Sequence, residues 1–178
     1  PAAALTPTSS AVRATAIQDF TTNPENNDEY RVVGAVGIFA AFIFKSTLST
    51  TETSYQRTVE IKIGATMADT IANIAHYFNA TGTPGTHFFV ASVIFTAQSI
   101  RDDMQVTVSA TTADTVTYRA VPSGTAANSW LGTEIADTGA DWTITRFSGG
   151  SVGTGSSPAA GTYRYFYTWF READGAET

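Results

Sequence analysis

A serine in a glycine-rich segment is the first side chain in this sequence whose type and spacing could do chemistry. Residues 149–153 read GGSVG, which matches the G-x-S-x-G pattern that presents a nucleophilic serine, here Ser151, between a strand and a helix. Gly, Ser and Pro follow the match, and these residues are typical of a linker rather than a helix. We therefore interpret the segment as a linker and rank hydrolysis last among the functions considered.

The histidines and the adjacent aspartates lack the spacing of a metal site or a catalytic triad. The only histidines, His76 and His87, are not in an H-x-x-x-H arrangement. Asp102 and Asp103 could ligate calcium, but the alternating oxygen ligands of a calcium loop are missing, which favours a hairpin turn. Glycine loops that bind phosphate or dinucleotides are also missing. We expect no catalytic residue, no cofactor and no metal, and hence no enzyme.

An aromatic run near the C-terminal end is the strongest candidate for a binding surface. Its members are Tyr163, Tyr165, Phe166, Tyr167, Trp169 and Phe170. Aromatic side chains can stack on sugars, but aromatic residues on both faces of one strand more often lie in a core or an interface. We interpret these six residues as interface residues, and carbohydrate binding is the alternative.

The composition excludes several classes of protein. Of the 178 residues only 15% are charged, and the formal net charge is −6. The ten basic residues are scattered, whereas a nucleic-acid-binding protein needs a basic stripe, so no nucleic acid is expected as a partner. The longest apolar run, residues 32–44, falls short of the roughly 20 residues of a membrane helix, so no membrane span is expected. The chain has no cysteine, which excludes disulfides and thiolate metal sites.

The pattern along the chain predicts a mainly β (α+β) fold, an antiparallel sheet or sandwich with one short helix packed on it. Residues 1–30, rich in Ala, Thr, Pro and Asn, are expected to form an extended arm. Residues 31–147 are expected to form a β-rich core domain. A Gly/Ser linker over 148–161 and an aromatic C-terminal strand over 162–178 follow.

Periodicity assigns the elements of the core domain. The apolar run 32–44 breaks near two glycines and predicts two strands, and residues 57–63 alternate as in a half-buried strand. Thr66 and Asp69 form a capping box ahead of a helix over about 67–79, whose other side carries Asn73 and Tyr77. Further strands are expected over 87–97, over 104–109 and 115–121 as a hairpin, and over 142–147.

The segment Val59–Ala80, VEIKIGATMADTIANIAHYFNA, resembles a pattern of bacteriophage virion structural proteins of the tail, fibre and adaptor type. In those proteins a strand runs into a G-A-T turn and a short helix that ends in an Asn-Ala pair. The downstream order is also similar, with alternating residues 105–110, a G-x-x-x-N loop at 124–128 and a Ser-Gly-Gly turn after Trp142. The terminal YRYFYTWFREADGAET is similar to the opening strand of fibronectin-like modules in phage structural proteins.

The resemblance implies a non-enzymatic virion protein that assembles with copies of itself and with other virion proteins. A tail, fibre or adaptor role is ranked ahead of capsid decoration, because the similar proteins are of the former kind. A fibre role would include host attachment. The alternative from another class is a carbohydrate-binding adhesion module whose partner is a cell-surface glycan.

Overall fold

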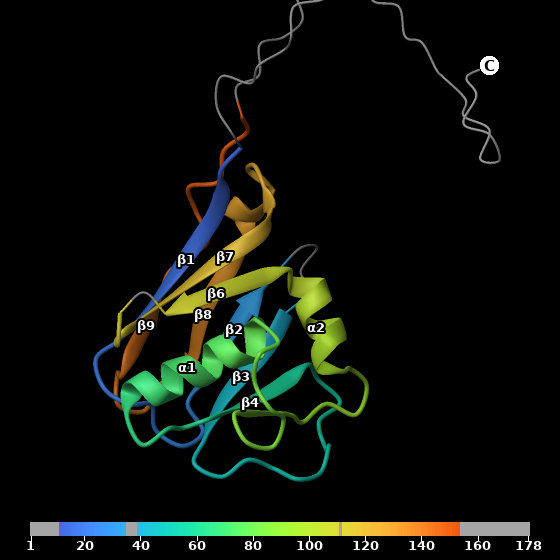
Figure 1. The fold of residues 1–178 in the computed structure, drawn as a ribbon, viewed down its shortest axis with the longest axis vertical. Coiled ribbons are helices and arrows are strands. Elements are labelled where there is room, and N and C mark those ends of the chain that lie inside the picture. Colours follow the sequence, from blue (N-terminus) through green and yellow to red (C-terminus); the bar gives the residue numbers. More distant parts are fainter. Residues whose placement is uncertain (1–10, 35–38, 111, 154–178) are drawn as a thin grey trace, which may run out of the picture.

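The computed structural model of this protein describes residues 11–34, 39–110 and 112–153, which form two β-sheets and two α-helices (Figure 1). The first sheet has the strand order β6-β7-β1-β9, with β6 at Val106–Ala110, β7 at Thr115–Ser123, β1 at Arg13–Phe20 and β9 at Trp142–Ile144. The second has the order β5-β4-β3-β2-β8, with β5 at Phe88–Val90, β4 at Thr58–Lys62, β3 at Phe39–Lys45, β2 at Glu29–Val33 and β8 at Leu131–Ala136. The helices are α1, Met67–Phe78, and α2, Ala97–Met104, and a 3-10 turn covers Ala126–Ser129.

This architecture confirms the predicted mainly β (α+β) class. All strand pairs of the first sheet are antiparallel. In the second sheet β3 and β4 are parallel and the other pairs are antiparallel. The expectation of a wholly antiparallel sheet is therefore wrong at β3–β4, because residues 46–57 carry the chain back along the sheet before β4 begins.

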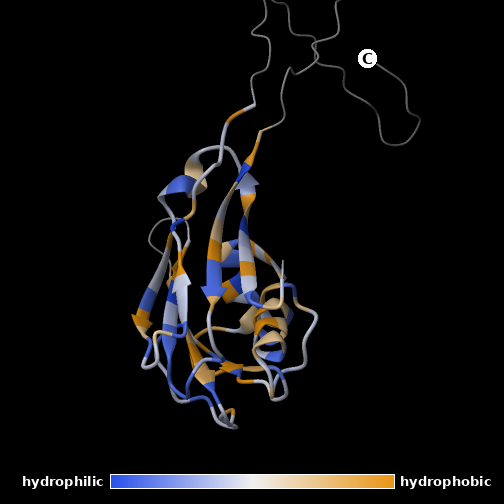
Figure 2. Ribbon diagram, turned by 90° about the vertical axis from the view of Figure 1, so that its left-hand side faces the viewer, coloured by the Kyte–Doolittle hydropathy of each residue, from blue (hydrophilic) through white to orange (hydrophobic). Residues whose placement is uncertain are grey.

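The core lies between the two sheets and is largely aromatic. Buried residues alternate with more exposed ones along β1, β2 and most of β7, so every second side chain of these strands enters the space between the sheets. Figure 2 shows hydrophobic and hydrophilic residues mixed along the strands of the two sheets. Tyr30 of β2 lies at the centre of this space. Its ring centroid is 5.0 Å from Phe42, 5.6 Å from Phe44, 5.6 Å from Trp142 and 6.4 Å from Tyr118. Tyr30 thus joins the inner faces of both sheets.

Three tyrosine side chains, Tyr30, Tyr77 and Tyr118, are fully buried in this core. Burial raises the pKa of Tyr30 and of Tyr118 well above the ordinary tyrosine value, so both side chains stay neutral. The Tyr118 hydroxyl donates a hydrogen bond to Gln18 Oε1 at 2.6 Å. This hydrogen bond satisfies the side-chain oxygen of the fully buried Gln18, whereas Gln18 Nε2 has no hydrogen-bond partner among the described residues.

The N-terminal arm predicted over residues 1–30 is wrong for residues 13–20, which form β1 between β7 and β9 in the first sheet. The inward residues of β1 are Ala14, Ala16, Gln18 and Phe20, and all are buried. Two alanines and a glutamine do not look like a hydrophobic face in a sequence, so the period-2 pattern is hidden. Residues 1–10 lie outside the described residues.

Helix α1 confirms the predicted helix and its capping box. The Thr66 hydroxyl accepts a hydrogen bond from the Asp69 backbone N–H at 3.2 Å, and the Asp69 carboxylate accepts one from the Thr66 N–H at 3.0 Å. The helix packs against β4 and β6. The predicted wet side of the helix is confirmed for Asp69, which is exposed, but it is wrong for Asn73 and Tyr77, which are buried. Asn73 Nδ2 donates to the Lys62 carbonyl at 2.8 Å, which satisfies its buried amide.

The stretch from His87 to Met104 differs from the prediction. Only Phe88–Val90 form a strand, and residues 97–104 form α2, a second helix on this mainly β domain. Thr96 caps α2 by accepting from the Ser99 N–H at 3.2 Å, but a Thr-Ser box is a weaker sequence signal than Thr-Asp. Asp102 and Asp103 therefore lie on a helix and not in a hairpin turn. The β6–β7 hairpin itself is confirmed.

The last described residues are tied to β1. Strand β9 ends at Ile144, earlier than the predicted strand over 142–147. Ser148 and Ser151, placed in the predicted linker, instead form bridges with Thr15 and Val12. The rest of the linker and the aromatic C-terminal strand, residues 154–178, lie outside the described residues.

Replacing Phe42 by alanine tests the aromatic core. Phe42 is fully buried against Tyr30, Tyr77 and Phe78, and Phe→Ala in a core costs about 3–5 kcal/mol. Urea unfolding should show a loss of that size. The control Phe39→Ala, at a 36% exposed position of the same strand, should lose much less. Equal losses would contradict the assignment of the core.

Candidate functional site

A groove of about 360 Å³ beside the edge strand β5 is the main surface feature of the described part of the chain. Its walls are mostly apolar and include Phe89, Val90, Val93, Ile94 and Phe95. Val93 is 40% exposed and Ile94 is 54% exposed. Two adjacent exposed aliphatic side chains on one groove wall form an apolar patch, which makes this groove the candidate binding surface.

A second hollow of about 240 Å³ adjoins this groove and shares Phe95 with it. The other lining residues are Phe39, Tyr55, Gln56 and Arg57. Tyr55 is 79% exposed. We call the two hollows together the edge groove, lined by residues 39, 52, 55–57, 84, 88–90 and 92–97.

The turn after β5 holds Val93 and Ile94 in place. The buried Ser92 hydroxyl accepts hydrogen bonds from the backbone N–H groups of Ile94 at 3.3 Å and Phe95 at 3.2 Å. The Val93 N–H donates to the Ser54 carbonyl at 2.9 Å. These bonds fix the turn against residues 53–54, so the outward apolar side chains belong to an ordered surface.

Arg57 and Glu60 position the other wall of the edge groove. The Arg57 guanidinium lies 4.3 Å from the centroid of the Phe95 ring, and its Nη2 is 3.0 Å from Asp103 Oδ2. The buried Glu60 carboxylate accepts hydrogen bonds from the Ser49 N–H and hydroxyl, both at 2.7 Å. Glu60 thereby anchors the 46–57 loop, which carries Tyr55.

The chemistry of the edge groove suits an apolar polypeptide. Strand β5 is hydrogen-bonded to β4 on one side and ends the second sheet, and such edges are normally covered. Arg57 is already paired with Asp103, so the groove offers no free cation for a phosphate or carboxylate ligand. Apolar contact is what this surface can provide.

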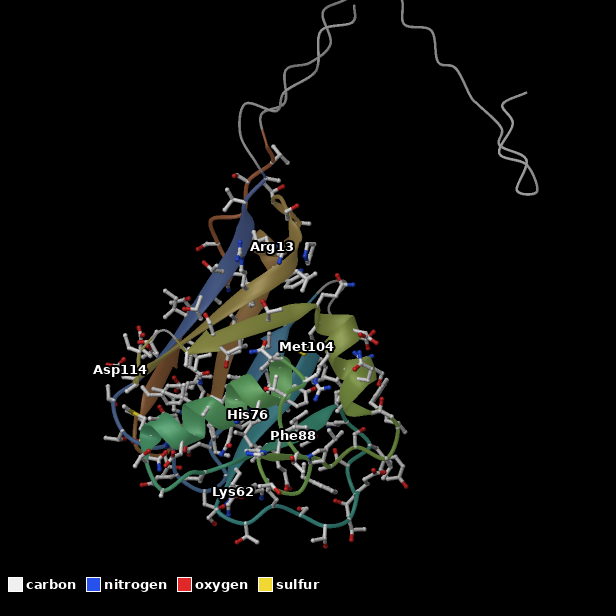
Figure 3. All side chains as sticks on the ribbon, in the orientation of Figure 1. Arg13, Lys62, His76, Phe88, Met104 and Asp114 are labelled. Carbon is white, nitrogen blue, oxygen red and sulfur yellow. The ribbon has the colours of Figure 1, made fainter. Side chains whose placement is uncertain are left out.

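The structure brings the two histidines together, which their spacing in the sequence did not predict. Their ring centroids are 4.4 Å apart. His76 and Phe88 lie close together (Figure 3), and both border Gly82, where an added Cβ would be 2.6 Å from His76 Cβ. His87 Nδ1 accepts from the Thr83 N–H at 3.0 Å. Among the described residues no third ligand completes a metal site with this pair.

The other candidate residues from the sequence stay apart from the edge groove, with one exception. Ser151 exchanges backbone hydrogen bonds with Val12, and neither histidine contacts it in the described part of the chain. Asp102 accepts from Gln98 Nε2 at 2.8 Å, whereas Asp103 supports the groove through Arg57. The six aromatic residues between Tyr163 and Phe170 lie outside the described residues.

Sequence reasoning missed the residues that line the edge groove. Val93 and Ile94 were assigned to a buried strand because a continuous apolar run has no periodicity that tells inside from outside. The available signal was Ser92 followed within a few residues by Thr96 and Ser99, a turn and a helix start that should have ended the strand.

Comparison with known proteins gave no relative. No protein-family model, curated protein or solved structure matches this chain. Among the described residues, none of the helices is long and apolar enough to cross a membrane. The function therefore has to be inferred from the chain's own residues.

Replacing Ser92 by alanine tests the turn that shapes the edge groove. Loss of a buried acceptor for two N–H groups should cost about 1–3 kcal/mol in thermal or urea unfolding. Ser109→Ala, at an exposed position of β6, serves as the control and should stay within about 0.5 kcal/mol of wild type. If the two variants are equally stable, Ser92 does not hold the turn.

Proposed function

We propose that this protein is a structural subunit of a bacteriophage virion, of the tail, fibre or adaptor kind, that assembles with copies of itself. The observation that carries the assembly part is the edge groove, where Val93, Ile94 and Tyr55 are exposed beside β5, the last strand of the second sheet. Covering this surface with a neighbouring copy removes apolar area from water and gives the edge strand a partner.

The aromatic residues between Tyr163 and Phe170 are the proposed complement of the groove. Their side chains are of the kind that fill apolar pockets at interfaces. A neighbouring copy that supplies this segment would repeat the same contact from subunit to subunit. Repetition of one contact is how a ring or a tube is built from identical chains.

The virion part of the proposal depends on the resemblance of Val59–Ala80 to phage structural proteins. In this chain the segment comprises β4, the turn with the Thr66 capping box, and α1. The low charge content and the hydroxyl-rich sequence also suit a protein that works by surface burial. We propose no catalytic role. Capsid decoration is the second role within the same class.

Ile94→Asp tests the edge groove as the contact between copies. A carboxylate placed on the groove wall should weaken self-association at least about tenfold, because burying an unpaired charge costs more than the roughly 1.4 kcal/mol that a factor of ten represents. Light scattering coupled to size-exclusion chromatography, over a concentration series, measures the change.

Ile135→Asp is the matched control. Ile135 is 45% exposed and lies on β8, at the opposite edge of the same sheet, so its variant should assemble as wild type does.

Trp169→Ala should weaken assembly if the aromatic segment fills the groove. A wild-type chain that is monomeric at high concentration would refute self-assembly, and a loss with Ile135→Asp alone would place the contact at β8.

A further inference from the structure

Three carboxylates converge where the loops at one end of the two sheets meet. Asp28 precedes β2, and Asp137 and Asp141 flank the turn between β8 and β9. One carboxylate oxygen from each residue lies within 4.8 Å of the others. Asp28 is fully buried and Asp141 is only 6% exposed. We call these three residues the aspartate cluster.

Hydrogen bonds fix the carboxylates of Asp28 and Asp137. Asp28 Oδ2 accepts from the Glu25 N–H at 2.8 Å, and its Oδ1 accepts from the Thr138 N–H at 3.0 Å and hydroxyl at 3.1 Å. Asp137 Oδ1 accepts from the Asp141 N–H at 2.8 Å. All the donors are neutral groups, so the hydrogen bonds orient the carboxylates without neutralising them.

Asp141 has an oxygen that no group of the described chain satisfies. Its Oδ1 accepts from the Thr22 hydroxyl, whereas Oδ2 is buried and has no hydrogen-bond partner. An ideal Cβ at Gly139 would lie 2.6 Å from Oδ1 and 2.7 Å from Oδ2, so the turn curls tightly against this carboxylate. A buried carboxylate oxygen without a donor needs an explanation, and a bound cation beside the two other carboxylates is one.

Among the described residues, no basic side chain pairs with the aspartate cluster. The ion pairs within the described ranges are Arg31 with Glu29 and Arg57 with Asp103, and neither involves the cluster. Buried carboxylates at such distances repel one another, and an uncompensated buried charge costs several kcal/mol. A bound cation would remove both penalties.

We propose that the aspartate cluster binds a calcium ion. Calcium takes oxygen ligands at 2.3–2.6 Å, so two oxygens on one ion lie up to about 5 Å apart, and the oxygens of the cluster, all within 4.8 Å of one another, meet this limit. Magnesium keeps several of its waters and usually binds through one or two carboxylates, so three converging carboxylates favour calcium. Carboxylates without sulfur or imidazole are the donors that a hard cation prefers.

A cation in this place ties the two sheets together. Asp28 leads into β2 and Asp137 follows β8, both in the second sheet, whereas Asp141 leads into β9 of the first sheet. The Asp141 carbonyl also accepts from the Thr21 N–H at 2.6 Å, just after β1. Calcium should therefore stabilise the folded chain, because it binds residues that are close together only after folding.

Two measurements on the full chain test the site. Thermal unfolding in calcium and in chelator should differ, and calcium at 100 times its dissociation constant should lower the unfolding equilibrium constant about 100-fold. Terbium, a calcium substitute, should emit on excitation of Trp142, because this buried indole is adjacent to Asp141. An unfolding temperature independent of calcium, without terbium emission, overturns the proposal. An equal response to magnesium overturns the assignment to calcium.

Asp141→Asn separates cation binding from a purely structural role. The variant should lose the calcium response and the terbium emission, yet in chelator it should unfold at or above the wild-type temperature, because one repelling charge is gone. If Asp141→Asn does not fold, Asp137→Asn replaces it, because Asp137 is only half-buried. This second variant should also lose the calcium response and the terbium emission. The control Asp102→Asn removes an exposed carboxylate on α2 and should respond as wild type does. A response lost equally in the control means non-specific binding. The outcome does not bear on self-assembly, which light scattering measures independently.

Discussion

The packing of aromatic rings around Tyr30 is the interaction on which the rest of this structure depends. Neither sheet has a hydrophobic face that could be left in water, and Tyr30, Phe42 and Phe44 of the second sheet meet Tyr118 and Trp142 of the first. Helix α1 adds Tyr77 and Phe78 to the same cluster. Aromatic side chains bury large areas, so a few of them can join two sheets and a helix. The positions of the loops, and thus of both surfaces discussed above, follow from this contact.

Once the core between the two sheets is packed, the outer strands of each sheet still have backbone groups without a partner strand. A sandwich cannot pair its outer strands internally, and each open edge must be protected or used. Next to β5 the chain turns at Ser92 and places Val93 and Ile94 toward solvent. Apolar side chains at this place do not discourage another chain from binding to the edge, as charged side chains would. Val93 and Ile94 carry no charge, and this is the physical reason for proposing this edge as a contact surface.

The sequence predicts an element well where its local signals agree and poorly where they do not. Helix α1 combines a capping box with apolar spacing, and β4 alternates, so both were found. Strand β1 was missed because Ala14, Ala16 and Gln18 fill inward positions, and these residues do not form a hydrophobic pattern in the sequence. The edge groove and the aspartate cluster were out of reach for another reason. Asp28 and Asp141 meet only through the tertiary fold, and no spacing rule connects residues on different sheets.

The two surfaces lie at opposite sides of the second sheet, and this separates their physical roles. The strand order β5-β4-β3-β2-β8 places the edge groove beside β5 and the aspartate cluster at the ends of β2 and β8. A cation at the cluster would stabilise the packing of the two sheets against each other, whereas a contact at the groove would stabilise the association of two copies. Because β4 and β3 lie between β5 and β2, a cation at the cluster would act mainly on the stability of each subunit and not on the edge strand β5. Stability and assembly can then respond to different conditions in one small domain.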